Sequence, residues 1–338
     1  MHHLLIGEGQ IGQSIVEAAL RRGDHVTILR RTVIDPVTDN QRHGANAHLI
    51  HRIAGDATDP EVLTRAAAGA PEAGPVDTIQ ACFHAAYDSR EWRRTLPVAE
   101  RAVLDIAARQ GIPVAFPESM YGYVGHVESL REGADFAPVD EKGRIRVELI
   151  TARRAHEART VSVIASDLIG PTTVGTFGAV ATAMVVEPLV AGRRAFVPGS
   201  TRAPHSLTHV PDLAEAMLFA AEHADELAGH FGTDAVVHAP SAPAQSLTEL
   251  AAVTMAELGH PGTAPKVTSI PHAVLAAAGL FERTMREIAA LKPLWYGACR
   301  LEPGVLTDVH ALRATGLAEA VAQTVAAVRG AKKTVPAA

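Results

Sequence analysis

Apolar residues in the first half of the chain gather in short runs, and the longer segments between them carry apolar residues every three to four positions. The short runs predict buried strands, and the longer spacing predicts amphipathic helices. A repeating strand–helix–strand order needs crossover connections, so we expect an α/β fold on a parallel sheet. The predicted strands are His3–Ile6, His25–Leu29, His48–Ile53, Thr78–His84, Ile112–Phe116 and Val161–Ser166.

Glycines mark the ends of the clearest helices. Gly23 follows the predicted helix Ser14–Arg22, and Gly111 follows the predicted helix Trp92–Gln110. A glycine directly after a helix favours a left-handed C-cap. The second half of the chain is less regular, with one predicted strand at Asp234–His238. The helices expected there are Ala179–Ala191, Pro211–Glu226, Ser246–Leu258 and His272–Ala290.

Composition and charge narrow the class of protein. The chain has 338 residues and a net charge of −6, so it can bury a large core, and its acidic balance argues against nucleic-acid binding. Two cysteines, Cys82 and Cys299, cannot form a disulfide framework, which favours a reducing compartment. We see no secretory signal and no apolar run of the roughly 20 residues that span a bilayer. We therefore expect a soluble cytoplasmic protein, a monomer or homodimer, with a small-molecule substrate and neither nucleic-acid nor membrane partners.

A glycine motif lies between the first predicted strand and the first helix. Gly7, Gly9 and Gly12 fit the pattern G-x-G-x-x-G, with Gln10 and Ile11 in the last gap. The first glycine permits a tight turn, the second lets the backbone approach a pyrophosphate, and the third allows close packing of helix and strand. The amino terminus of the helix then offers amide donors to phosphates. In this strand–loop–helix context the motif predicts a dinucleotide site.

The end of the second predicted strand bears on which dinucleotide binds. An NAD site usually places Asp or Glu there, whereas this chain has Arg30 and Arg31. Arginine suits the 2′-phosphate of NADP through charge-assisted hydrogen bonds. We expect NADP to be favoured, with NAD possible; the alternative is two solvated arginines at a strand end.

The segment after the third predicted strand is a candidate for the adenine end of the site. Asp56 and Ala57 follow Gly55, and the Asp56 carboxylate could accept from the adenine amino group. The alternative role for Asp56 is to cap the next helix, although Asp59 and Pro60 are better placed for that purpose.

With these motifs, the chain resembles the extended short-chain dehydrogenases/reductases, also called the NAD-dependent epimerase/dehydratase family. The resemblance implies a Rossmann-type doubly wound sheet with a smaller C-terminal substrate domain, and it implies that Ala85 and Ala86 line the cofactor site. The expected dinucleotide domain is 1–170 plus about 205–228, the substrate domain is 171–204 and 229–330, and 331–338 form a flexible tail. The residues that carry the resemblance are Gly7–Gly12, Gly55–Asp59, His84–Ala86, Ser119–Gly122, Gly170–Pro171 and His209–Ala214.

The catalytic residues of that family are not in their usual form here. The family pairs a proton-exchanging Tyr with a Lys four residues later, and no Tyr-x-x-x-Lys occurs in this chain. Lys142 stands at the expected Tyr position, and Arg146, which could contact the ribose, stands at the Lys position. The upstream serine is also displaced, because Ser119 lies two residues before Tyr121. The resemblance therefore implies an atypical member with non-standard catalytic residues.

Three hypotheses for the active site follow. Lys142 could do acid–base work with a depressed pKa, Tyr121 or Tyr123 could supply the phenol, or the protein could bind a dinucleotide without catalysis. The leading function is an NAD(P)-binding reductase, dehydrogenase or epimerase of a small carbonyl or sugar-type substrate. The alternative is a catalytically silent sensor or regulatory protein. The 17 histidines show no metal-ligand spacing, so we expect no metal.

Overall fold

The structure is a computed structural model that describes residues 1–32, 36–176, 178–231 and 234–334. The chain divides into two compact units, each made of several segments. Unit 1 comprises residues 1–118, 145–163 and 214–237, and unit 2 comprises residues 119–144, 164–213 and 238–338. Of the expected tail, 331–334 form the last turn of a helix, and 335–338 lie outside the described residues.

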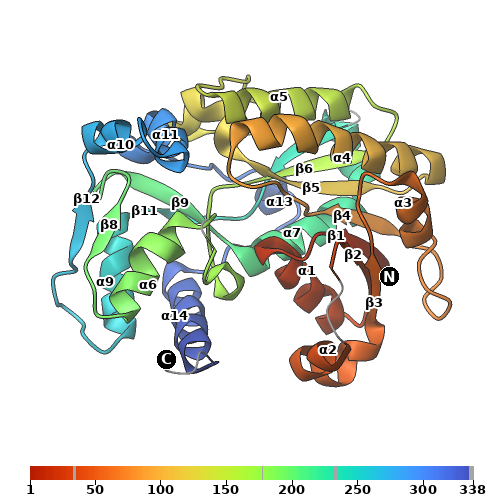
Figure 1. Cartoon of the computed structure of the whole chain (residues 1–338), viewed down its shortest axis with the longest axis horizontal. Helices are drawn as coiled ribbons and strands as arrows, with labels where there is room; N and C mark the ends of the chain where they lie inside the picture. The colour runs from red at the N-terminus through yellow and green to blue at the C-terminus, as the bar shows by residue number, and fades with distance from the viewer. Residues whose placement is uncertain (33–35, 177, 232–233, 335–338) are drawn as a thin grey trace. The chain divides into compact units, whose positions relative to one another are not determined.

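Unit 1 is built on a parallel sheet of seven strands in the order β10-β6-β5-β4-β1-β2-β3. Helices α3, α4 and α5 cover one face of the sheet, and α1 and α7 cover the other (Figure 1). This arrangement confirms the expected α/β, doubly wound, Rossmann-type fold. The strands are β1 (His2–Ile6), β2 (His25–Arg30), β3 (Ile50–Ala54), β4 (Thr78–Ala81), β5 (Val114–Ser119), β6 (Thr160–Ala165) and β10 (Asp234–His238). The helices are α1 (Gln10–Arg21), α2 (Pro36–His43), α3 (Pro60–Ala67), α4 (Ser89–Gln110), α5 (Glu141–Arg154), α7 (Val210–Glu222) and α8 (Ala224–Phe231).

Strand β1 is buried on both faces, which explains its unbroken apolar appearance in the sequence. Leu4 and Ile6 join the core beneath α3 and α4, where they meet Leu63 and Val103. Because side chains alternate along a strand, His3 points to the opposite face, where its ring contacts Thr78. The sheet therefore has an apolar core on the side of Leu4 and Ile6, and His3 makes a polar contact on the other side.

Unit 2 contains two small sheets and most of the C-terminal helices. One sheet has the order β11-β9-β7, and the other pairs β12 with β8. Its core brings Ile169 and Leu207 together with α6, α9 and α14. The strands are β7 (Asp167–Ile169), β8 (Ala195–Val197), β9 (Pro204–His209), β11 (Ala242–Ser246) and β12 (Val267–Ser269). The helices are α6 (Glu187–Val190), α9 (Leu247–Glu257), α10 (His272–Ala278), α11 (Arg283–Ala290), α12 (Lys292–Tyr296), α13 (Val305–Asp308) and α14 (Leu317–Thr334).

Two long helices expected from the sequence are each broken in the structure. The segment 272–290 forms α10 and α11, because Gly279 ends the first helix and the Glu282 side chain caps the second by accepting from the Thr284 and Met285 amides. The segment 211–226 is likewise shared between α7 and α8. Apolar periodicity continues across both breaks, so periodicity alone predicted one helix in each place.

The predicted strand ends also need correction. The strand expected at Thr78–His84 stops at Ala81, and the one expected at His48–Ile53 begins at Ile50, after a 3₁₀ helix at Gly44–Leu49. The helix expected from Ser14 already begins at Gln10. In the described part of the chain, no helix is both long enough and apolar enough to cross a membrane.

Candidate functional site

The glycine loop joins β1 to α1, and packing fixes two of its three glycines. Gly7 has φ +92°, and a Cβ there would lie 2.9 Å from the Cys82 carbonyl oxygen. A Cβ on Gly12 would lie 2.3 Å from the Gly7 carbonyl oxygen. Both positions therefore exclude any side chain, as the motif requires of a tight turn and of close helix–strand contact.

Gly9 has a different environment. It is the N-cap of α1, no side chain caps that helix end, and no atom lies within 4 Å of the position of its Cβ. Gln10 and Ile11 form the first turn, which contains no acidic residue. A helix amino terminus next to open space fits a pyrophosphate, because the amides and the positive end of the helix dipole favour an anion.

Arg30 is held beside the glycine loop by Glu8. The Arg30 Nη1 atom donates to Glu8 Oε2 at 2.9 Å, and Arg52 donates to both Glu8 oxygens at 2.8 and 2.9 Å. Arg52 also pairs with Asp39 of α2. Burial raises the pKa of Glu8, but the hydrogen bonds and charges of Arg52 and Arg30 outweigh it and hold the pKa below its usual range. Arg31 is exposed.

The sequence alone did not predict this network. Glu8 stands at a variable position of the glycine motif, and Arg52 lies inside a strand that reads as apolar. A charged residue in the middle of a predicted buried strand was the available signal, because such a side chain needs a partner.

The candidate residues at the adenine end follow β3, and the candidates expected to line the cofactor site follow β4. Asp56 is exposed and accepts from the Thr58 amide and hydroxyl, each at 2.9 Å, and these bonds lower the pKa of its carboxyl. Asp59 caps α3, as expected. Ala85 and Ala86 follow β4, and the Ala86 carbonyl accepts from the Trp92 indole at 2.9 Å.

Arg146 lies in unit 1, as Ala85 and Ala86 do, and is almost fully buried. Its Nη2 donates to His84 Nε2 at 2.8 Å, its guanidinium lies 4.9 Å from the centre of the Trp92 ring, and Nε is 3.4 Å from a Glu118 oxygen. His84 Nδ1 donates to the Ala85 carbonyl at 2.7 Å, so Nε2 keeps its lone pair for Arg146. Loss of water around the ring and the charge of Arg146 lower the pKa of His84 to about 4. Arg146 thereby meets the loop that carries Ala85 and Ala86.

The four candidate catalytic residues belong to unit 2. Ser119 ends β5, and its hydroxyl accepts from the Tyr121 amide at 3.4 Å. The Tyr121 side chain is partly exposed, whereas Tyr123 is buried, with its ring centre 5.2 Å from that of Phe136. The turn after β5 also touches the start of α5, since a Cβ on Gly143 would lie 2.5 Å from the Tyr121 carbonyl oxygen.

Lys142 is fully buried at the start of α5. Its Nζ lies 2.6 Å from Glu287 Oε2 and 3.2 Å from the Glu287 carbonyl oxygen, both on α11. The Asp140 carboxylate is 3.5 Å away. Two carboxylates therefore surround this ammonium group. Nothing in the sequence pointed to Glu287, which is 145 positions away.

Together, the parallel sheet, the glycine loop and the amino terminus of α1 define a dinucleotide-binding α/β protein. The model of the NAD dependent epimerase/dehydratase family matches residues 4–233. The chain belongs to this family, as its resemblance implied. No curated protein matches the chain in sequence.

Solved structures share the fold at low sequence identity. The enzyme WbmH of Bordetella bronchiseptica, in complex with NAD+, superposes with a TM-score of 0.70 at 18% identity over 97% of this chain and 98% of that chain. The UDP-glucose 4-epimerase of Thermus thermophilus, in complex with NAD, gives 0.69 at 19% identity over 98% and 100%. The UDP-glucose 4-epimerase of Thermotoga maritima, with UDP-glucose, gives 0.68 at 14% identity over 98% and 100%.

Proposed function

We propose that the protein is an NADP-favouring oxidoreductase or epimerase that acts on a small carbonyl or sugar-type substrate. The observation that carries the cofactor preference is Arg30 at the carboxyl end of β2, beside the glycine loop and followed by exposed Arg31. A 2′-phosphate at this strand end meets two guanidinium groups where an NAD site offers a carboxylate. The solved relatives bound to NAD and to UDP-glucose support the general class of cofactor and substrate.

The cofactor preference is tested by titrating NADPH and NADH into the protein. We expect NADPH to bind more tightly, and Arg30→Ala to cost NADPH about ten- to a hundredfold in affinity while changing NADH little, since a charge-assisted contact contributes about 1.5–3 kcal/mol. Arg94→Ala is the matched control, because Arg94 is an exposed arginine on α4. Equal binding of the two cofactors, with no effect of Arg30→Ala, would refute the preference.

For catalysis we propose Tyr121 as the proton-exchanging group and Arg146 as a contact to the cofactor ribose. Tyr121 is partly exposed and lies close in sequence to Ser119, whereas Tyr123 is packed against Phe136. We assign Lys142 a positioning role, since its ammonium is enclosed by Glu287. Replacing Tyr121 by Phe should lower the rate by roughly 10²–10⁴ and remove one limb of the pH–rate profile. A loss of that size in a Lys142→Met or Tyr123→Phe variant that urea unfolding shows to be folded, but not in Tyr121→Phe, would move the role to that residue.

A second candidate function is dinucleotide sensing without catalysis. It is favoured by the absence of a Tyr-x-x-x-Lys pair and by the burial of Lys142. The two functions are separated by following NADPH oxidation against a panel of aldehydes, ketones and nucleotide sugars. Tight cofactor binding without turnover of any compound supports sensing, and turnover of one compound supports the enzyme.

A further inference from the structure

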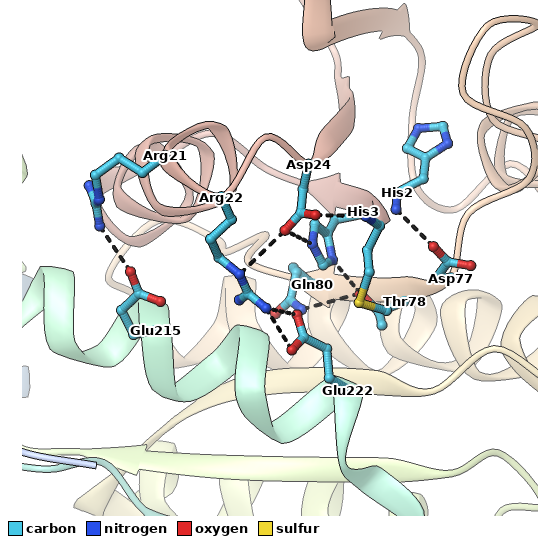
Figure 2. Close-up of polar contacts among 11 residues, drawn as sticks. His2, His3, Arg21, Arg22, Asp24, Asp77, Thr78, Gln80, Glu215 and Glu222 are labelled. Carbon is cyan, nitrogen blue, oxygen red and sulfur yellow. Dashed lines mark hydrogen bonds and ion pairs between the residues drawn. The ribbon is translucent and has the colours of Figure 1, made fainter. Parts of the chain in front are cut away.

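A second polar cluster lies in unit 1 at the opposite end of β1 from the glycine loop (Figure 2). It consists of His3 on β1, Asp24 just before β2, and Glu222 at the end of α7. His3 Nε2 is 3.3 Å from Asp24 Oδ2. In the described part of the chain this is the one group of three or more His, Cys, Asp and Glu residues whose ligand atoms all lie within 4.8 Å of one another.

The atoms behind these three residues orient them. His3 Nδ1 is hydrogen-bonded to the Thr78 hydroxyl at 2.8 Å, which fixes the ring and directs Nε2 towards the acids. The Met1 ammonium binds Asp24 Oδ1 at 2.6 Å and leaves Oδ2 facing His3. A hydrogen bond to the far nitrogen of a histidine is the usual support of a metal ligand.

Gln80 supplies an independent observation. It is fully buried on β4, next to Thr78 and beside the cluster (Figure 2). Its Nε2 donates weakly to Thr78 at 3.5 Å, while its Oε1 has no hydrogen-bond partner among the described residues. A buried carbonyl oxygen without a donor is costly, and a bound cation would satisfy it.

Arg22 is the cation that now pairs with both acids. Its Nη2 donates to the two Glu222 oxygens at 2.6 and 2.7 Å, and its Nε lies 3.4 Å from Asp24 Oδ2. The side chain is 35% exposed, so it reaches the cluster from the solvent side. A long flexible side chain at the mouth of the cluster can leave without disturbing the sheet.

We propose that His3, Asp24 and Glu222 form a site for a divalent transition-metal cation, with Zn²⁺ as the probe, which displaces Arg22. One imidazole and two carboxylates are a ligand set that suits zinc and its neighbours, and the doubly charged ion balances both acids. The ion would tie β1 and the start of β2 to α7, which is a structural role distinct from dinucleotide binding.

The test is a zinc titration of the full chain, without an affinity tag, by competition with a chromophoric chelator. We expect one zinc per chain, weakened at least about tenfold in Glu222→Gln, since even outer-shell changes cost 10–100-fold. Glu215→Gln is the matched control, because Glu215 also lies on α7 but pairs with Arg21, outside the cluster (Figure 2). Zinc should also raise the unfolding temperature of the wild type and not that of Glu222→Gln.

A further set of variants changes Arg22, the side chain that the metal ion would displace. Arg22→Gln should bind zinc about tenfold more tightly than the wild type, whereas Arg21→Gln should not change it. His51→Gln excludes binding at the neighbouring pair, because His51 Nε2 lies 3.1 Å from His25 Nδ1. Equal zinc affinity in Glu222→Gln and Glu215→Gln, loss of binding in His51→Gln alone, or weaker binding in Arg22→Gln would each overturn the proposal. Urea unfolding without zinc establishes that every variant folds.

Discussion

A side chain on Gly9 would enter the space that we propose for the pyrophosphate. A side chain on Gly7 or Gly12 would instead clash with neighbouring backbone atoms. The Gly9 backbone is extended, with φ −82°, and nothing lies within 4 Å of its Cβ position. Gly9→Val should therefore keep the free energy of unfolding nearly unchanged and abolish NADPH binding, because the valine fills the space of the pyrophosphate. Gly12→Val should instead unfold the protein. Calorimetry and urea unfolding measure both effects; normal NADPH affinity in Gly9→Val would place the cofactor elsewhere.

A second prediction concerns Glu8. Its carboxylate pairs with Arg30 and Arg52, so it reduces the positive charge available to a 2′-phosphate. Glu8→Gln should raise the NADPH-to-NADH affinity ratio by about three- to tenfold, the equivalent of about 1 kcal/mol of electrostatic interaction. Glu17→Gln, on the exposed side of α1, is the control. A ratio that falls in Glu8→Gln would show that the carboxylate itself binds the cofactor.

Single residues also show which features could be predicted from the sequence. The glycine loop, the Asp59 cap and Gly111 at the end of α4 were predictable, because each acts on backbone within a few positions. The partners of Glu8 and Lys142 were not, since Arg52 and Glu287 are brought near only by the fold. The cluster of His3, Asp24 and Glu222 was not predictable for the same reason, and no metal was expected from the sequence.

Among the elements, α5 and α11 are joined by a buried ion pair. Removing one partner of a buried pair leaves an uncompensated charge, so Lys142→Met should destabilise the protein by about 3–5 kcal/mol. The double variant Lys142→Met, Glu287→Met should recover part of this loss, because it removes both members of the pair but leaves the buried Asp140 carboxylate without its lysine. Urea unfolding of the two single variants and the double variant measures the coupling. If the double variant loses as much stability as the two single variants together, the interaction between Lys142 and Glu287 contributes nothing to the free energy of unfolding.

Element types were more predictable than element ends. Repeated strand–helix order was enough for the parallel sheet, because a parallel connection must cross over. Strand β4 ends before the loop that carries His84, and α10 ends at the Gly279 cap. The spacing of apolar residues encodes neither end. Candidate cofactor residues such as Ala85 lie in such loops, so the candidate site was less predictable than the sheet that supports it.

The whole molecule should lose stability as the pH falls below neutrality. Burial lowers the pKa of His2, His3 and His205, so the unfolded chain binds protons more readily than the folded chain does. Their contribution is complete above the unfolded pKa of about 6.5 and is lost as the pH falls from there towards the folded values. Asp167 acts in the opposite sense: burial raises its pKa to about 6, so its stabilisation is complete near pH 3.8 and is lost as the pH rises through 6.

Because several histidines oppose two aspartates whose pKa burial raises, Asp167 and Asp234, the free energy of unfolding should fall between pH 7.5 and pH 5.5. Urea unfolding with a chelator present, which removes any bound metal, measures the slope. His2→Gln should flatten it, because the amide keeps a donor for the Gly74 carbonyl and an acceptor for the Thr27 hydroxyl but takes up no proton. His48→Gln, at an exposed position, should leave it unchanged. Stability that rises towards pH 5.5 in the wild type would mean that the two aspartates outweigh the histidines.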